Sequence, residues 1–433
     1  MVASVGVVRF HALEERNVMF MQALPGFRDF LPDDCAARNY VFARWREVAR
    51  RCAFVEWDGP PLEATELYRK KSGAEIVDQL FNFTDKGERE VAMRPELTPT
   101  LARVVAVHER EFKKPLKWFS IGQFFRYEKQ QRGRLREHFQ LNCDIIGEAH
   151  LAADIELMAL CIDILRAFGF TDKDFVVRVS DRDFWTDFLR EKDISADRWD
   201  ELLQAIDKFG REPREKTAEK LGNLADPVFA ILKSGGKSEK LDKLVDGLRA
   251  RGLADFVSID VGIVRGLAYY TGIVFEVFDR AGKFRAIAGG GRYDNLIAQL
   301  SDGAVSMPAL GFAMGDVVLG ELINETAHVR QKLENAIANS RKIDIYVVIA
   351  KEQCRADALG QIQQLRDRGY RVDYPLTSEK VGKQFQIAEQ LGARVAVLFG
   401  DEWPQLKLKD MSSGEQHLVS KDDFMSDVES TLR

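Results

Sequence analysis

Polar and apolar residues alternate over residues 118–146, a pattern that predicts two β-strands joined by a loop. Successive side chains of a strand point to opposite faces, so the polar residues of the second strand share one face. The loop is rich in cations and contains Gly133, as is typical of an exposed loop that meets phosphate. The polar strand residues are His138, Gln140, Asn142 and Asp144, and the loop cations are Lys129, Arg132, Arg134 and Arg136.

The pattern alone leaves two interpretations of this hairpin open. A half-buried hairpin often turns a polar face to water without any further chemistry. An ordinary water-facing side would, however, be rich in Thr and Lys, whereas this hairpin presents Arg, Gln, Asn and Asp. Together with the neighbouring cationic loop, that composition favours a ligand-binding face.

Elsewhere the spacing of apolar residues predicts a mixed chain of several domains. Helical periodicity covers residues 33–52, 99–111 and 151–168, and residues 181–251 indicate a charged, inserted helical module. Strand patterns cover residues 175–179 and much of 259–278. After a polar helical linker over residues 325–342, strands and helices alternate, which predicts a small, mainly parallel α/β domain.

Composition narrows the class of protein. A chain of 433 residues has room for two or three domains. Its net charge of −5 argues against a protein that coats nucleic acid indiscriminately. The five cysteines form no CxxC pair, so we expect no zinc site or disulfide framework, and a reducing compartment fits. The sequence contains no run of 18 apolar residues, so we expect no membrane-spanning helix.

Two groups of polar residues suggest a pocket with an anionic and a cationic part. Arg94, Glu96 and Thr98 occupy alternate positions in a segment that contains two prolines, so an extended chain would point all three the same way. A helix N-cap at Thr98 explains that segment equally well. An anionic part beside a cationic one suits a zwitterionic small molecule meeting a polyphosphate. The anionic part would combine Glu96 and Asp144 with Thr98, Gln140 and Tyr270, and the cationic part Arg126 and Arg265 with Arg132 and Arg134.

A cluster of three glycines, residues 289–291, has no standard nucleotide-binding pattern. It lacks the Lys-Ser/Thr ending of a phosphate-binding P-loop and forms no GxGxxG sequence. Three consecutive glycines more often mark a turn or a bulge. They also allow a ligand to approach the backbone closely.

Five ordered segments give the chain a close resemblance to a known family. Residues 24–32 (LPGFRDFLP), 125–128 (FRYE) and 309–315 (ALGFAMG) resemble the three motifs of class II aminoacyl-tRNA synthetases. Residues 265–272 (RGLAYYTG) and 288–296 (AGGGRYDNL) are similar to the two signature segments of histidyl-tRNA synthetases. The resemblance extends over roughly residues 20–430.

The resemblance implies a domain organisation and a homodimer. It implies an α+β catalytic domain whose antiparallel sheet of six or seven strands is flanked by helices, with residues 24–52 at the dimer interface. The implied ranges are an N-terminal extension (1–19), the class II catalytic domain (20–170 and 256–325), a helical insertion domain (171–255), a linker (326–341) and an anticodon-binding α/β domain with a mainly parallel sheet (342–433).

The resemblance also implies an activity and its residues. L-histidine and ATP, with Mg²⁺ carried by the ATP phosphates, would give histidyl-adenylate, and the histidyl group would then pass to the tRNA specific for histidine in the cytoplasm. By this resemblance the α-amino group of histidine would be held by Glu96, Thr98 and Gln140, and its imidazole by Asp144 and Tyr270, with Tyr269 and Tyr293 beside the ring. The α-phosphate of ATP would be bound by Arg126 and Arg265 and the adenine by Glu128, and Arg132 and Arg134 would also contact ATP. The acceptor end of the tRNA would meet Lys129, Gln131, Arg132, Arg134 and Arg136, and no metal would be bound by the protein itself.

The chain departs from the family pattern at three positions. Val318 stands where the family usually has an arginine that meets ATP, and Arg132, Arg134 or Arg292 are candidates to replace it. Asp144 is one methylene shorter than the glutamate of many bacterial relatives. Ala268 stands where an aspartate is common.

Two alternative functions follow from the same residues. One is a catalytically impaired synthetase paralogue that acts as the regulatory subunit of an ATP phosphoribosyltransferase, which Val318 would favour. The other is a non-enzymatic tRNA-binding protein that uses residues 342–433 and the basic loop. Retention of Arg265, of the tyrosine pair and of the C-terminal domain favours the enzyme.

Overall fold

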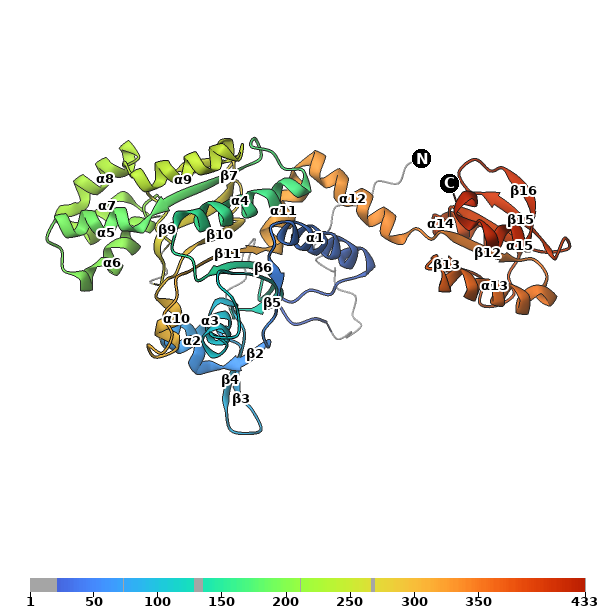
Figure 1. Cartoon of the computed structure of the whole chain (residues 1–433), viewed down its shortest axis with the longest axis horizontal. Coiled ribbons are helices and arrows are strands. Elements are labelled where there is room, and N and C mark those ends of the chain that lie inside the picture. Colours follow the sequence, from blue (N-terminus) through green and yellow to red (C-terminus); the bar gives the residue numbers. More distant parts are fainter. Residues whose placement is uncertain (1–21, 73, 128–134, 211, 266–268, 433) are drawn as a thin grey trace, which may run out of the picture. The chain divides into compact units, whose positions relative to one another are not determined.

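The computed structural model describes residues 22–72, 74–127, 135–210, 212–265 and 269–432. The chain divides into two compact units, residues 1–333 and residues 334–433 (Figure 1). Within the described ranges, no helix is both long and apolar enough to cross a membrane.

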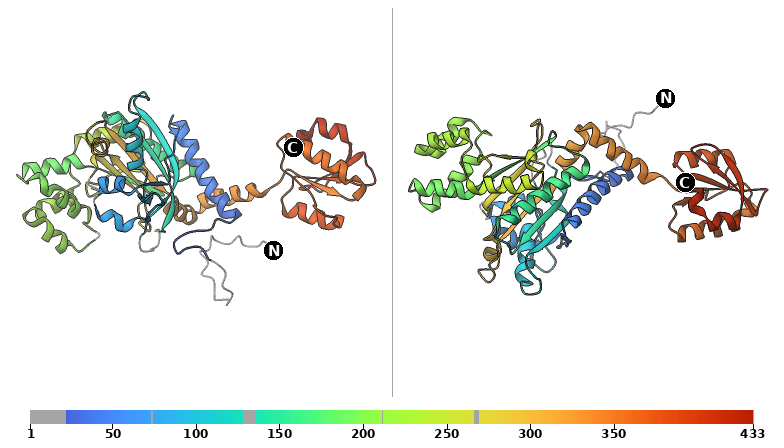
Figure 2. Two further views of the ribbon diagram at one scale, coloured as in Figure 1. Left: turned by 90° about the horizontal axis from the view of Figure 1, so that it is seen from below. Right: turned by 45° about the horizontal axis from the view of Figure 1, so that its top comes forward.

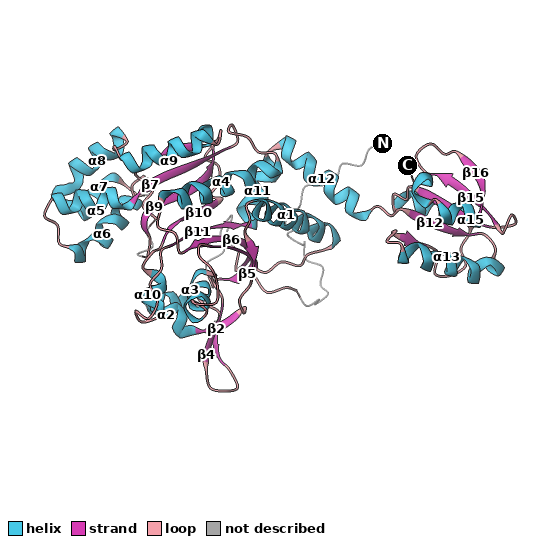
Figure 3. Cartoon of the chain, in the orientation of Figure 1, coloured by secondary structure: helices cyan, strands magenta, loops and turns pink. Residues whose placement is uncertain are grey.

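An eight-stranded sheet forms the centre of the first unit (Figure 3). Its six inner strands are antiparallel, which confirms the expected fold class, and a short parallel strand is added at each edge. In sheet order the strands are β1 (Val55–Glu56), β5 (Leu116–Phe125), β6 (Glu137–Ile146), β11 (Ala309–Gly315), β10 (Ala288–Arg292), β9 (Thr271–Asp279), β7 (Phe175–Asp181) and β8 (Val257–Ile259).

The glycine cluster lies inside this sheet. Gly289, Gly290 and Gly291 belong to strand β10, and the register with β9 shifts between Gly291 and Arg292. The expected bulge is therefore present, but at the end of a strand rather than in a turn. The expected strand over residues 259–278 is wrong for its first part, because a turn occupies residues 261–262 and β9 begins only at Thr271.

Long helices cover one face of the sheet and leave the other for a ligand. Helix α4 (Leu151–Phe168) packs on β6 and β11 and against α1 (Pro32–Arg51) and α9 (Glu239–Ala250). Most of its side chains are buried, and Gly169 ends it in a left-handed conformation that favours glycine. Helix α11 (Asp316–Glu325) follows β11 directly, and α12 (Ala327–Arg341) leads into the second unit.

Smaller elements close the end of the sheet near β1 and β5. Helix α3 ends at Val107, four residues earlier than expected, and Leu97 rather than Thr98 occupies its N-cap position. The N-cap interpretation of Thr98 is therefore wrong. The elements here are β2 (Leu62–Ala64), α2 (Thr65–Ser72), β3 (Asn82–Thr84), β4 (Glu90–Met93), α3 (Thr98–Val107) and α10 (Leu296–Leu300).

Residues 182–234 form a helical group at the opposite end of the sheet, beside β7 and β9 (Figure 2). Leu202, Leu203 and Ile206 recur at helical spacing and are buried in a core around Trp185. The helices are α5 (Arg182–Glu191), α6 (Trp199–Asp207), α7 (Arg214–Leu221) and α8 (Ala225–Ser234).

The second unit is an α/β domain with helices on both faces of a five-stranded sheet. Strands β13, β12 and β14 are parallel, and β15 and β16 continue the sheet in antiparallel fashion. Strand β12 is apolar throughout because both of its faces are covered. The elements are β12 (Ile345–Ile349), α13 (Arg355–Asp367), β13 (Val372–Asp373), α14 (Val381–Gln390), β14 (Val395–Phe399), β15 (Gln405–Asp410), β16 (Gln416–Ser420), α15 (Lys421–Ser426) and α16 (Val428–Thr431).

Candidate active site

A cavity of about 660 Å³ lies over the inner strands of the large sheet. Its walls come from β6, β9, β10 and β11 and from the loops that precede α3 and β9. Segments as far apart in the sequence as those of Glu96 and Val318 therefore meet in one place. The predicted site residues that line the cavity are Glu96, Thr98, Arg126, Gln140, Asp144, Arg265, Tyr269, Tyr270 and Tyr293.

The polar face of β6 forms one wall of this cavity. All four of its alternating polar side chains, His138, Gln140, Asn142 and Asp144, are among the lining residues. The prediction that they share a face is confirmed, and this face lines a hollow rather than an open surface. The hairpin partner β5 holds β6 in register over ten residue pairs, so the four side chains keep a fixed spacing.

Asp144 forms the buried acidic end of the cavity. Tyr293 Oη donates a hydrogen bond of 2.6 Å to Asp144 Oδ1. Burial raises the pKa of Asp144 to about 7, and the hydrogen bond from Tyr293 only partly opposes that shift. The carboxyl group has room because Gly311 faces it across the strand pair β6–β11, where a Cβ would lie 1.9 Å from Asp144 Oδ1.

The raised pKa of Asp144 predicts a pH-dependent stability difference from Asp144→Asn. Unfolded Asp144 ionises near its ordinary pKa, whereas the folded chain keeps the proton up to about pH 7. Unfolding therefore releases this proton between about pH 4 and 7, so the free energy of unfolding falls as pH rises, by at most about 1.4 kcal/mol per unit.

Thermal unfolding of both proteins from pH 4 to pH 8 measures this difference. We expect Asp144→Asn to gain stability relative to the unchanged chain as pH rises to 7, and the gain to stay constant above that. A difference that does not vary with pH would contradict the raised pKa.

Lys71 is a site residue that the sequence did not reveal. Its Nζ bonds Glu96 Oε2 at 2.5 Å and lies 4.0 Å from the centre of the Tyr269 ring. The Lys71 side chain is only 1% exposed, so this ammonium group belongs to the interior of the site. Nothing in the local pattern of helix α2 signals the contact, because Glu96 comes from a different element.

Arg265 is held in an unusual backbone conformation that directs it into the cavity. Its φ of 52° lies in the left-handed region, which a non-glycine residue adopts rarely. Its guanidinium lies 5.1 Å from the centre of the Tyr270 ring, and Nη1 is 3.4 Å from Glu276 Oε1. Gly289 leaves the space that Arg265 fills, since a Cβ there would lie 1.6 Å from Nη1.

Arg126 also lines the cavity. It follows the end of β5, and its Nε donates a hydrogen bond of 3.0 Å to the carbonyl oxygen of Pro95, which fixes the side chain beside Glu96. His138 stays neutral in this surrounding: burial first, and then the charges of Arg126 and Arg28, lower its pKa to about 3.

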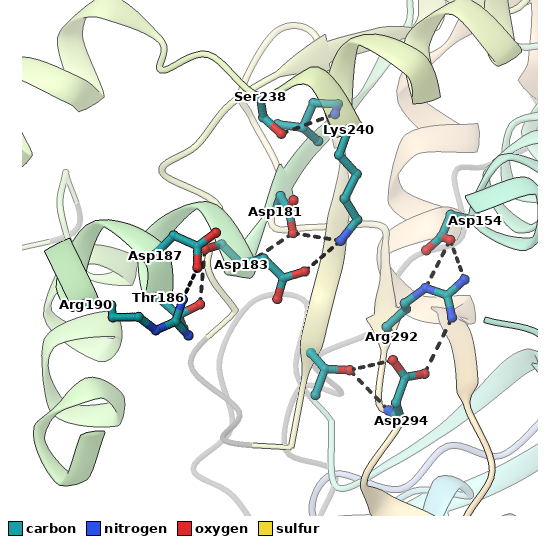
Figure 4. A network of polar contacts seen from close by, with 12 residues as sticks. Asp154, Asp181, Asp183, Thr186, Asp187, Arg190, Ser238, Lys240, Arg292 and Asp294 are labelled. Atoms are coloured by element: carbon teal, nitrogen blue, oxygen red, sulfur yellow. Dashed lines mark hydrogen bonds and ion pairs between the residues drawn. The ribbon is translucent and has the colours of Figure 1, made fainter. Parts of the chain in front are cut away.

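Two arginines lie elsewhere than the sequence suggested. Arg94 does not share the direction of Glu96 and Thr98; its Nη1 bonds Asp58 at 2.7 Å, and Arg94 is absent from the cavity lining. Arg292 is likewise absent from that lining and forms a buried ion pair of 2.6 Å with Asp154 (Figure 4). The hypothesis that Arg292 replaces the arginine missing at Val318 is therefore wrong.

The remaining residues named from the sequence lie outside the cavity lining or outside the described residues. Arg136 lies 4.4 Å from the Tyr127 ring centre, outside the cavity lining. Glu128, Lys129, Gln131, Arg132, Arg134 and Ala268 lie outside the described residues.

The arrangement suits one kind of ligand pair. Carboxylates and tyrosines meet at one end of the cavity, and Arg126 and Arg265 line the same space. A carboxylate accepts hydrogen bonds from an amine or an imidazole, and guanidinium groups bind carboxylate and phosphate. The geometry therefore accommodates an amino acid placed against a nucleotide phosphate.

Comparison with known sequences identifies the relatives of this chain. A family model for histidyl-tRNA synthetase matches residues 26–316, and one for an anticodon binding domain matches residues 344–431. A histidine–tRNA ligase of Opitutus terrae is 42% identical and covers 94% of this chain and 98% of its own length. A chloroplastic/mitochondrial histidine–tRNA ligase of Arabidopsis thaliana is 37% identical and covers 92% of this chain and 85% of its own length.

Solved structures share the fold. Histidyl-tRNA synthetase from Nostoc sp. PCC 7120 matches with a TM-score of 0.74 at 23% identity, over 95% of this chain and 100% of its own. The apo enzyme of S. aureus matches with a TM-score of 0.71 at 22% identity, over 94% of this chain and 99% of its own.

Proposed function

Because this chain belongs to the histidyl-tRNA synthetase family, we propose that it is a histidine–tRNA ligase, which uses ATP to join L-histidine to its tRNA. The observation that carries this proposal is the single cavity in which Glu96 and Asp144 meet Arg126 and Arg265. Amino-acid activation needs such a meeting, since the amino acid must lie beside the α-phosphate of ATP.

In the first step an oxygen of the histidine carboxylate attacks the α-phosphorus of ATP. A bond forms between them, the bond to the bridging oxygen of the β-phosphate breaks, and pyrophosphate leaves. Negative charge grows on the α-phosphate in the transition state, where Arg126 and Arg265 would stabilise it. Both side chains are held by the protein before the reaction, so little reorganisation is needed when that charge develops.

The acidic end of the cavity would select histidine. Asp144, held by Tyr293, would accept a hydrogen bond from the imidazole, with Tyr270 and Tyr269 packed beside the ring. Glu96, Thr98 and Gln140 would hold the α-amino group. A buried acceptor of this kind discriminates strongly, because an amino acid without a ring N–H leaves the carboxyl group without its partner.

In the second step a hydroxyl of the terminal ribose of the tRNA attacks the acyl carbon of the adenylate, and AMP leaves. The tRNA would meet the catalytic unit through the loop of residues 129–136. The second unit, which matches the anticodon binding domain, would read the other end of the molecule.

Mg²⁺ would arrive with ATP rather than reside in the protein. Among the described residues, no group of three or more His, Cys, Asp and Glu side chains is placed to hold a metal ion. Glu276 is a carboxylate near Arg265 in the cavity lining, and it could share a phosphate-bound ion.

A homodimer and a cytoplasmic location complete the proposal. Leu24 and Leu31, in the segment that would form the dimer interface, are 68% and 67% exposed. All five cysteines are free, as in a reducing compartment. Light scattering after size-exclusion chromatography tests the dimer, which should give twice the chain mass.

Histidine-dependent exchange of labelled pyrophosphate into ATP tests the activity. We expect exchange with histidine and none with histidine omitted, followed by charging of the histidine-specific tRNA. Binding of tRNA without exchange would overturn the proposal and support a non-catalytic paralogue or tRNA-binding protein.

A further inference from the structure

A third arginine lines the cavity beside those already assigned. Arg285 lies in the connection between β9 and β10, and the four residues that follow it, Ala286 to Gly289, line the same wall. Arg285 lies outside the five segments that resemble the family motifs. Arg285 is exposed, whereas Asp144 in the same lining is buried.

The two assigned arginines leave part of ATP without a cationic partner. Arg126 and Arg265 would both act at the α-phosphate, whereas the β- and γ-phosphates carry further negative charge. The helix that follows β11 offers no cation to them, because Val317 and Val318 are the α11 residues that line the cavity. Asp316, which begins that helix, is paired with Arg28 at 3.0 Å and is absent from the lining.

The position of Arg285 along the wall suits those outer phosphates. Arg265 Nη1 lies against Gly289, four residues after Arg285. Four residues of chain span at most about 14 Å, and bends at Arg285 and Ile287 keep this segment shorter than that. A long, exposed arginine side chain at the far end of that segment would meet phosphoryl groups that extend from the α-phosphate toward solvent.

We propose that Arg285 binds the β- and γ-phosphates of ATP, the part that leaves as pyrophosphate. This inference rests on the proposed function, because it assumes that ATP occupies the cavity with its α-phosphate at Arg126 and Arg265. Arg285 then takes part in substrate binding and in neutralising the leaving group, in the place where Val318 offers no charge.

The affinity for a ligand that lacks the β- and γ-phosphates should not depend on Arg285. We expect Arg285→Gln to raise the dissociation constant of ATP with Mg²⁺ about 10-fold, as for one charge-assisted hydrogen bond. The dissociation constant of AMP should change less than about twofold. Arg285→Lys, which keeps the charge without the planar fork, should fall between Arg285→Gln and the unchanged chain.

Calorimetric titration of the full chain with ATP and with AMP measures these constants. Lys283→Gln is the matched control, since Lys283 lies in the same connection, pairs with Glu325 and does not line the cavity. Equal weakening of ATP and AMP by Arg285→Gln, or unchanged ATP binding, would overturn the inference.

The same variants separate this inference from the proposed function. If the unchanged chain catalyses histidine-dependent pyrophosphate exchange and Arg285→Gln leaves the KM for ATP unaltered, only the role of Arg285 is wrong. If the unchanged chain binds neither ATP nor AMP, the proposed function itself fails, and the inference with it. Transfer of histidine from preformed adenylate to tRNA should be unaffected by Arg285→Gln, because no pyrophosphate is present in that step.

Discussion

Arg265→Ala is expected to lower the rate of histidine-dependent pyrophosphate exchange by roughly 10²- to 10³-fold, below detection in a standard assay. Loss of one fixed donor to a developing oxyanion costs about 3 to 4 kcal/mol of transition-state stabilisation. Arg265 is such a donor, since Tyr270 and the space at Gly289 hold its guanidinium in place. Burial alone would lower the pKa of Arg265, but Tyr270 and Glu276 raise it on balance, so the side chain stays charged.

A matched variant distinguishes this role from a general loss of structure. Arg178→Ala removes an arginine from the neighbouring strand β7, where its Nη1 is 3.4 Å from Asp260 and it does not line the cavity. That variant should retain normal exchange. Thermal unfolding of both variants reports on folding, and near-normal exchange by a folded Arg265→Ala protein would refute the assignment.

Gly311→Ala is expected to weaken histidine binding by about 10- to 100-fold, as for loss of a hydrogen bond to a charged group. The added Cβ would lie 1.9 Å from Asp144 Oδ1 and 3.0 Å from the carbonyl oxygen of Cys143. The Asp144 side chain would have to move and would lose its hydrogen bond from Tyr293. Overpacking of this buried site should also destabilise the fold by about 1 to 3 kcal/mol.

Gly320→Ala is the control for this substitution. Gly320 lies in helix α11 five residues after β11, and no atom outside the nearby backbone of that helix lies within 4 Å of a Cβ placed there. Alanine favours a helix over glycine by roughly 1 kcal/mol, so stability should be unchanged or slightly higher. Equilibrium binding of histidine measures both variants. Equal histidine affinity for Gly311→Ala and Gly320→Ala would show that Asp144 does not contact the amino acid.

The sequence predicts best where the signal is local. The alternating face of β6 could be read from residues 138–144 because a strand has a period of two, and each of those polar side chains lines the cavity. The order of helices and strands in the second unit follows from the same kind of periodicity. These features need no knowledge of what packs against them.

Contacts between distant segments could not be predicted in this way. The pairing of Lys71 with Glu96 joins helix α2 to the loop before α3, and Arg292 reaches Asp154 in a helix 138 residues earlier. Arg94 shares its spacing with Glu96 and Thr98, yet Asp58 and two backbone carbonyls hold it elsewhere. In each case the partner comes from tertiary packing, which overrides the direction suggested by the local pattern.

Arg28 makes the segment ahead of α1 part of the catalytic unit's interior. Its guanidinium contacts Glu137 at 2.6 Å, where β6 begins, and Asp316 at 3.0 Å, where α11 begins. Asp316 also accepts a hydrogen bond of 2.9 Å from the backbone N–H of Phe139. A chain shortened beyond residue 28 would leave two neighbouring carboxylates without their shared counter-ion, at the junction of two cavity walls. Trimming that end would therefore disturb the ligand pocket, although none of the described residues up to Arg28 lines it.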